Sequence, residues 1–532
     1  MIEVEVHQQL RAFLRYQEKP YWPHHLTMAR LVARALRLGR SALIQTGCYG
    51  CHQLSYLMPL LMWDGPVILV VPDPLRQRLE LVDMPQLQQW MQVDKAIQTG
   101  DRWPDEDFQG VLMVSPNSWL GEVIAFSEAS SPASSLASSL ASLQSRDRRF
   151  PIGIPTIIDG AEELEELALK QLSASIEPAD WNRLALVRPD LAEIIRDIRV
   201  RLTRAIFQHP ANPYECCVLE KEERQILRQL YQLLEGTILP SSWNRFWQRF
   251  EAVEEFSNSG AAIANITPTI VSASIDRSMG QWTLSCGPVE VASALARVWP
   301  QQPVVLIGSA LDLEPKASIY RQQVGLGDVT CVKFSPDPDR KLIRLYQPDR
   351  FPMPNTPQFQ EALIQELRSL LCIGASRDGL TTILVGDMPL RTRVGSLLAA
   401  EFGSRVRVEK IEVDEKSILV AGWEFWRQNS QILPPPKLLA IATLPLPSLE
   451  DPIVAGRVRY YKQRRLDWFR LYLLPTALST LQRATATARH SLGVVALLDS
   501  RVINRTYGQQ VLAALSPYSR IDYLDVTYFA DW

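Results

Sequence analysis

Residues 44–54 combine a glycine-containing turn with side chains that could do chemistry. An apolar run leads into the turn, which contains Gly47, and an apolar segment follows it. A strand, a turn of this kind and a helix are the setting of a phosphate-binding loop, which needs a Lys for the β- and γ-phosphates and a Ser or Thr for Mg²⁺. Here those two places hold His52 and Gln53, and the Gly expected before the Lys is Cys51. The pattern predicts a nucleotide loop that has lost its chemistry.

Two cysteines, Cys48 and Cys51, lie in the same turn at a Cys-x-x-Cys spacing. This spacing occurs in half-sites for zinc and in redox sites. A zinc site needs two further ligands, and the sequence has no second Cys or His pair at a usual spacing. We therefore favour incidental cysteines over a metal or redox centre, and we predict no metal site.

Further segments flank the turn, and their order carries more information than any one of them. They are Trp22-Pro23-His24-His25 before the turn, and Asp159-Gly160-Ala161-Glu162, Gly308-Ser309-Ala310-Leu311, Phe425-Trp426, Leu444 to Pro452 and Gln482 to Arg489 after it. In this order they resemble the motifs of the DinG/XPD branch of superfamily 2 DNA helicases, over most of the chain. The resemblance implies two RecA-like domains and ATP-dependent work on DNA.

The resemblance also implies which residue should carry each step at the acidic motif. Asp159 matches the aspartate that could hold Mg²⁺. Gly160 stands where a Glu would polarise the attacking water, and Glu162 stands where the family has a His. On the adenine side, Trp22 replaces an Arg and His25 a Gln. We expect Asp159 to be a relic at a strand end.

The last motif of the family, Gln-x-x-Gly-Arg-x-x-Arg, is matched in part. Gln482 and Arg489 are kept, whereas Ala486 stands where the resemblance places the Arg that reaches the γ-phosphate. Losing one such Arg can cost about 10³-fold or more in rate. The phosphate-binding Lys, the Mg²⁺-binding Ser or Thr, the water-polarising Glu and this Arg are all replaced. We therefore predict a pseudoenzyme that binds neither ATP nor Mg²⁺ tightly. Some relatives carry a four-Cys iron–sulfur cluster before the acidic motif, but residues 54–158 contain no Cys, so we expect none.

A basic and aromatic stretch offers a different kind of site. Its cations are Arg457, Arg459, Lys462, Arg464, Arg465 and Arg470, and Arg483 and Arg489 extend the positive surface. Cations interleaved with Tyr and Trp can grip single-stranded DNA or another nucleic acid through phosphate contacts and stacking. The alternative, which we favour, is an amphipathic helix with inward aromatic side chains and solvated cations. Trp-rich helices at 162–261 (Trp181, Trp243, Trp247) suggest a buried core, with a protein-binding face as the alternative.

The elements that must position these residues follow from periodicity. Short apolar runs alternate with helical patterns, which predicts an α/β fold with two RecA-like parallel-sheet domains and a helical insertion in the first. The expected divisions are 1–161 for the first part of domain 1, 162–261 for a wholly helical insertion, 262–331 for the completion of domain 1 and 332–532 for domain 2. The Ser- and Ala-rich stretch 127–145 is expected to be a linker or a weak surface helix.

Composition limits the function classes. Net charge is −2, which argues against a surface that binds nucleic acid as a whole. The sequence has no charge-free apolar run long enough to span a membrane and no visible secretory signal, and its seven cysteines are irregularly spaced, so a cytoplasmic protein is expected. Three hypotheses remain: a dead helicase fold that binds nucleic acid, a protein-interaction scaffold, and, least favoured, an active ATP-dependent DNA helicase.

Overall fold

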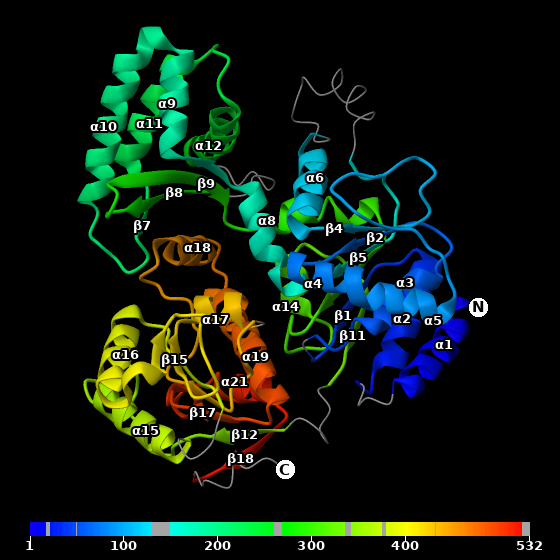
Figure 1. The fold of residues 1–532 in the computed structure, drawn as a ribbon. Helices are drawn as coiled ribbons and strands as arrows, with labels where there is room; N and C mark the ends of the chain where they lie inside the picture. Colours follow the sequence, from blue (N-terminus) through cyan, green and yellow to red (C-terminus); the bar gives the residue numbers. More distant parts are fainter. Residues whose placement is uncertain are drawn as a thin grey trace.

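The computed structural model describes residues 1–17, 22–48, 50–129, 149–259, 269–335, 342–374, 379–430 and 432–523. Two seven-stranded parallel sheets form the centres of two domains, and a smaller domain is inserted in the first (Figure 1). The predicted α/β class with two RecA-like parallel-sheet domains is confirmed.

The central strands of the sheet of domain 1 are buried on both faces. Its strands, in spatial order, are β11 (Thr330–Lys333), β1 (Ala42–Gln45), β10 (Val304–Gly308), β5 (Thr156–Asp159), β2 (Val67–Val70), β4 (Val111–Val114) and β3 (Ile97–Thr99). Most of these strands are short apolar runs, as expected of parallel strands covered by helices on both sides. The loops that leave β1, β10 and β5 therefore lie side by side at one edge of the sheet.

Helices cover each face of this sheet. One face carries α1 (Ile2–Tyr16), α2 (His25–Leu38), α3 (Leu54–Met62), α4 (Asp73–Arg78) and α5 (Met84–Met91). The other carries α6 (Pro116–Ala129), α8 (Leu164–Leu172), α13 (Ala292–Leu295) and α14 (Ser318–Gln323). The stretch 127–145 falls mostly outside the described residues, and residues 127–129 end α6.

Domain 2 repeats this architecture. Its strands, in spatial order, are β14 (Val406–Val408), β15 (Ile418–Ala421), β13 (Thr381–Leu384), β16 (Leu438–Ile441), β17 (Val494–Leu497), β12 (Ile343–Tyr346) and β18 (Tyr518–Ile521). Its helices are α15 (Phe359–Gly374), α16 (Met388–Phe402), α17 (Trp423–Asn429), α18 (Pro452–Gln463), α19 (Leu474–His490), α20 (Arg501–Asn504) and α21 (Gly508–Leu515).

The insertion is not wholly helical, so that prediction was wrong. Its helices α9 (Pro178–Val187), α10 (Ala192–Gln208), α11 (Lys221–Leu234) and α12 (Ser241–Ser259) pack on a four-stranded antiparallel sheet. That sheet joins β6 (Ala174–Ile176) and β7 (Cys216–Val218) to the hairpin β8 (Thr269–Asp276) and β9 (Gln281–Pro288). Two strands of three residues are too short to interrupt a helical periodicity. The tryptophans of the insertion (Trp181, Trp243, Trp247) lie in its core.

Two predicted boundaries shift as a result. The β8–β9 hairpin belongs to the insertion, so among the described residues of the range 262–331 only β10 and the first part of β11 complete the sheet of domain 1. β11 extends to Lys333, past the expected start of domain 2 at residue 332. Figure 1 shows α18 between the insertion sheet and the rest of domain 2, where it joins the two.

Candidate functional site

The loop after β1 and the end of β5 bring the two halves of the predicted nucleotide site together. His52 lies just before α3, and Asp159 is the last residue of β5. His52 Nε2 lies 3.0 Å from Asp159 Oδ1, and the Tyr56 hydroxyl donates to Asp159 Oδ2 at 2.9 Å. All three residues are buried. Both oxygens of the carboxylate that would hold Mg²⁺ therefore accept hydrogen bonds from the loop and helix that would hold phosphate.

Electrostatics favour an ion pair in this network. Burial by itself lowers the pKa of His52, but Asp159, through its charge and hydrogen bond, and Glu162 raise it more, so it lies above the usual 6.5. Burial and the Asp159 charge also raise the pKa of Tyr56. The Tyr56 hydroxyl therefore stays protonated and donates a hydrogen bond to the carboxylate. The imidazolium and carboxylate offset each other's charge within the domain.

The residues on the expected adenine side are also engaged internally. His25 Nδ1 lies 2.8 Å from the Ser55 hydroxyl of α3. Burial, with a contribution from the charge on His52, lowers the pKa of His25 to about 4, so this ring is neutral. Trp22 packs edge-on against His25 and Phe334. These side chains form a packed junction between α2, α3 and the chain after β11.

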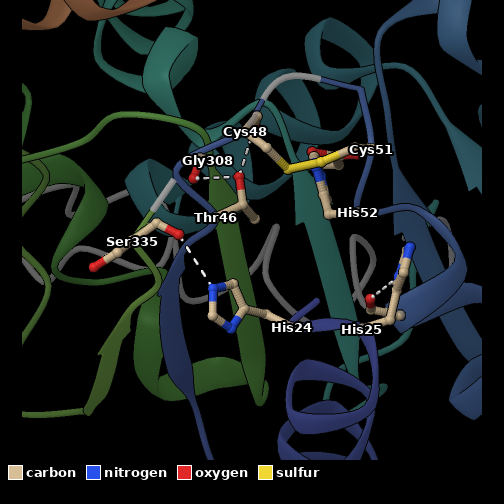
Figure 2. The surroundings of a disulfide bond; sticks show 10 residues. His24, His25, Thr46, Cys48, Cys51, His52, Gly308 and Ser335 are labelled. Carbon is tan, nitrogen blue, oxygen red and sulfur yellow. Dashed lines mark hydrogen bonds and ion pairs between the residues drawn. A yellow bond between two sulfur atoms is a disulfide. The ribbon is translucent and has the colours of Figure 1, made fainter. Parts of the chain in front are cut away.

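The loop itself is closed by a covalent bond. Cys48 and Cys51 form a disulfide (Figure 2), so the prediction of incidental cysteines was wrong. The N–H groups of Thr46 and Gly47 donate to the carbonyls of Gly308 and Ser309, at 2.9 and 3.2 Å. The Thr46 hydroxyl donates to the Cys48 carbonyl at 2.9 Å. The hydrogen-bond donors in the first part of the turn are therefore already bonded to acceptors within domain 1.

Gly160 has a backbone reason to be glycine. Its φ is +91°, in the region that residues with a Cβ avoid, and its N–H donates to the Ile307 carbonyl at 3.1 Å. A Glu at this place would be strained in the observed conformation. The backbone conformation at the end of β5 therefore favours glycine over a residue with a carboxylate side chain at position 160.

A cavity of about 370 Å³ lies beside these residues and between the two domains. Domain 1 contributes Gly50, His52, Gln53, Pro72, Pro74, Leu75, Arg78, Asp159, Gly160, Glu162 and Ser309, and domain 2 contributes Ser430, Leu433, Pro435 and Thr487. Of the charged groups in this lining, Arg78 pairs with Asp83 at 3.1 Å. Asp159 and Glu162 add carboxylates, and no Lys is among the lining residues.

Glu162 lies at the junction between the cavity and domain 2. Its Oε1 accepts from the Ser309 hydroxyl at 2.9 Å, while its Oε2 is buried without a hydrogen-bond partner among the described residues. Burial raises the pKa of Glu162, and Arg483 and the Ser309 hydrogen bond offset this only in part. The family position that holds a His therefore carries an acid tied to the neighbouring loop.

Three arginines of domain 2 reach the acidic segment after Asp159. Arg427 of α17 lies 3.0 Å from Glu166, and Arg483 of α19 donates to Glu163 at 2.8 Å. Arg457 of α18 donates to Glu165 at 2.5 Å, and its guanidinium lies 4.3 Å from the centre of the Tyr472 ring. The two domains are therefore joined by ion pairs next to the interdomain cavity.

The last motif is arranged differently from the expectation. α19 directs Arg483 to domain 1, while Thr487 lines the cavity. Gln482 and Ala486 are half-buried on α19. Arg489 is buried within domain 2, where it donates to the carbonyls of Leu515 and Pro517, and burial lowers its pKa to about 10. The sequence did not reveal that Arg483 would form the contact between domains.

The basic stretch is divided by α18. Tyr460 and Tyr461 are buried, and Arg457 points inward. The exposed cations of α18 and of the two residues after it are Arg459, Lys462, Arg464 and Arg465. The Arg464 guanidinium lies 4.6 Å from the Tyr460 ring centre, and the Lys462 ammonium lies 5.2 Å from that of Trp468. The inward aromatic side chains agree with the amphipathic-helix alternative, and the four cations remain at the surface.

Comparison with known proteins supports the fold. Residues 436–518 match the family described as "Helicase C-terminal domain". The structure is similar to that of an XPD helicase, with a TM-score of 0.57 and 12% identity over 95% of this chain and 100% of the other. It is similar to S. tokodaii Xpd4 to the same TM-score and identity, over 94% and 100% of the two chains. A search of curated proteins finds no match.

The resemblance to DinG/XPD-type helicases is thereby confirmed, as a helicase C-terminal domain within a chain that has the XPD fold. Among the described residues, no group of three or more His, Cys, Asp or Glu side chains could hold a metal ion. No helix in the described ranges is long and apolar enough to cross a membrane. The absence of an iron–sulfur cluster and a cytoplasmic location stay predictions.

Proposed function

We propose that this chain is a helicase-fold pseudoenzyme that works without ATP hydrolysis and binds nucleic acid. The observation that carries the proposal is the engagement of Asp159 by His52 and Tyr56. A Mg²⁺ ion takes oxygen ligands, and both oxygens of this carboxylate already accept hydrogen bonds within the domain. Binding the ion would require breaking the buried pair between His52 and Asp159, which costs free energy. The described residues of the site include no Lys that could bind a phosphate and so offset this cost.

The charge of the cavity also argues against a nucleoside triphosphate. Its lining includes Asp159 and Glu162 and no Lys, and its Arg78 is already paired with Asp83. Triphosphate sites need cations and a metal ion to neutralise the phosphates. ATP and Mg²⁺ therefore do not fit the residues present, and we assign no step to them.

Nucleic-acid binding is supported by the exposed end of α18. Arg459, Lys462, Arg464 and Arg465 lie together along the last turn and the residues just after it. Such a cluster can contact successive phosphates of a strand without base specificity. Because the buried tyrosines are not free to stack, we expect phosphate contacts to supply most of the affinity.

The test is single-strand binding by fluorescence anisotropy across a salt series. We expect affinity to fall as salt rises, with a slope of about −0.7 per phosphate contact. The variant with Arg459, Lys462, Arg464 and Arg465 all changed to Ala should lose most of the binding and most of the slope. Arg196→Ala/Arg204→Ala, which removes two exposed cations from α10, is a control for cations elsewhere on the surface and should bind normally. Binding that ignores both salt and the α18 variant would refute the proposal.

A scaffold without nucleic acid is the second candidate. The insertion exposes large apolar side chains, including Leu186 at 78% and Ile238 at 90% exposure. Such groups mark a protein interface where they form a contiguous patch. Co-purification at native expression that recovers a partner through the insertion, together with no strand binding, would favour this function over the first.

An active helicase is the least favoured alternative. It would require turnover of ATP that increases with DNA and disappears in Asp159→Ala. We expect no such turnover, because Gly160 supplies no carboxylate to orient water and Arg483 is held by Glu163. DNA-stimulated hydrolysis that this variant abolishes would overturn the pseudoenzyme proposal.

A further inference from the structure

The disulfide between Cys48 and Cys51 has no part in the function proposed above. It closes a small ring in the turn between β1 and α3 (Figure 2). Both cysteines are half-buried rather than enclosed in the core, and reactive cysteines are typically exposed in part. Outside oxidising compartments, a disulfide at such a place is usually transient and serves catalysis or redox sensing.

The position of the pair favours exchange. A Cys-x-x-Cys turn between a parallel strand and a helix is the arrangement of thiol–disulfide sites. Cys51 lies three residues before Leu54, the first residue of α3, and no side chain caps that helix. The partial positive charge of a helix N-terminus stabilises a thiolate and so improves it as a leaving group.

Three of the other cysteines lie in a different setting. Cys216, Cys217 and Cys286 are unpaired and buried. Burial raises the pKa of the thiols of Cys216 and Cys286 to about 12. Thiols of this kind are inert. Cys372 is exposed and unpaired, and it provides an internal reference for thiol accessibility.

The disulfide is coupled by covalent connection to the cavity. Gly50 lies inside the ring, and His52 and Gln53 follow it directly, and all three line the cavity. The Cys48 carbonyl also accepts the hydrogen bond from Thr46 that orders the start of the turn. A change at the sulfur atoms is therefore transmitted to the loop that forms one wall of the cavity and holds Asp159.

We propose that Cys48 and Cys51 form a reversible thiol–disulfide site, which exchanges with dithiols and controls the conformation of the loop at the interdomain cavity. This inference is independent of nucleic-acid binding and would stand if that proposal failed.

The exchange conserves atoms and electrons. A thiolate of the dithiol attacks the Cys48 sulfur, the bond to Cys51 breaks, and the Cys51 thiolate leaves and takes a proton. The second thiol of the reductant is then deprotonated and attacks the first sulfur of the same reductant molecule, which is bonded to Cys48 in the mixed disulfide. Cys48 leaves as a thiolate and also takes a proton. Two electrons and two protons pass to the pair, and the dithiol becomes a disulfide.

The test combines alkylation with amide exchange on the full chain. The protein is equilibrated at a series of reduced-to-oxidised dithiothreitol ratios, free thiols are alkylated, and mass spectrometry follows Cys48, Cys51 and Cys372. We expect Cys48 and Cys51 to become protected together in one two-electron transition that reverses on reduction. Cys372 should stay alkylated throughout.

Hydrogen exchange of the peptide covering residues 44–56 then tests the coupling. Opening the ring should make exchange of the loop amides roughly ten-fold faster, since a short closed loop loses its constraint. Cys48→Ser and Cys51→Ser should exchange at the fast rate in every buffer, and Cys372→Ser should behave as the wild type. A pair that alkylates fully even under oxidising conditions would overturn the proposal. So would a loop whose exchange is the same in both states.

Discussion

The pair formed by His52 and Asp159 is the most informative contact at the scale of single residues. The helicase resemblance places a phosphate-binding Lys at position 52 and a metal-binding Asp at position 159. In this protein the side chains at these two positions contact each other directly. Removing one partner of a buried pair costs about 3 to 5 kcal/mol, because the other charge is left uncompensated. We expect His52→Gln to lower the free energy of unfolding by an amount in this range, measured by urea denaturation.

The pH dependence of this effect has a definite sign. The folded-state pKa of His52 is raised above its unfolded value near 6.5. The stability that protonated His52 contributes by pairing with Asp159 is therefore fully present below about pH 6.5 and is lost as pH rises through the folded-state pKa. Wild type should exceed His52→Gln by more at pH 6 than at pH 9, and Asp159→Asn should remove the difference.

Gly160 gives a second residue-scale prediction. Since φ is +91° there, Gly160→Ala should destabilise the protein by about 1 to 2 kcal/mol. Gly327→Ala is the control, because that glycine has open space around it and no positive φ in this region. Equal unfolding midpoints for the two variants would show that the strand end relaxes freely.

The individual elements show where sequence patterns suffice. The apolar runs of β1, β2, β4 and β13 are legible because both faces of these parallel strands are buried. β6 and β7 are missed, because three residues between long helices carry too little pattern. The disulfide was signalled by the spacing of Cys48 and Cys51, but pairing of two cysteines depends on the path of the turn. The contact between Arg483 and Glu163 joins segments far apart in sequence, so periodicity could not find it.

Helix α18 gives a prediction at the element scale. Arg457 is held by Glu165 and the Tyr472 ring, although it belongs to the predicted nucleic-acid surface. Arg457→Ala should therefore destabilise the protein by about 3 kcal/mol, while Arg459→Ala, one residue along and exposed, should change stability by less than about 0.5 kcal/mol. Strand binding should show the reverse order, because only Arg459 is free to contact phosphate. A loss of binding in a folded Arg457 variant would contradict this division.

At the scale of the whole molecule, ion pairs hold the cleft between the two RecA-like domains. Arg427→Ala/Arg483→Ala removes contacts to Glu163 and Glu166 without touching either core. We expect the distance between fluorophores placed on the two domains to increase and become broader, and high salt to have the same effect on the wild type. Arg368→Ala breaks an ion pair inside domain 2 and should leave the distance unchanged. An unaltered distance in the double variant would assign the closed arrangement to other contacts.

The central claim is that Asp159 is satisfied within the protein, so that the old nucleotide site no longer takes its ligand. Calorimetric titration of the full chain with ATP and Mg²⁺, repeated in the presence of a single-stranded oligonucleotide, tests it most directly. The account predicts no ATP binding in either experiment, and heat only from the oligonucleotide. Micromolar binding of ATP would contradict it, because His52 and Gln53 would then have to support a nucleotide site.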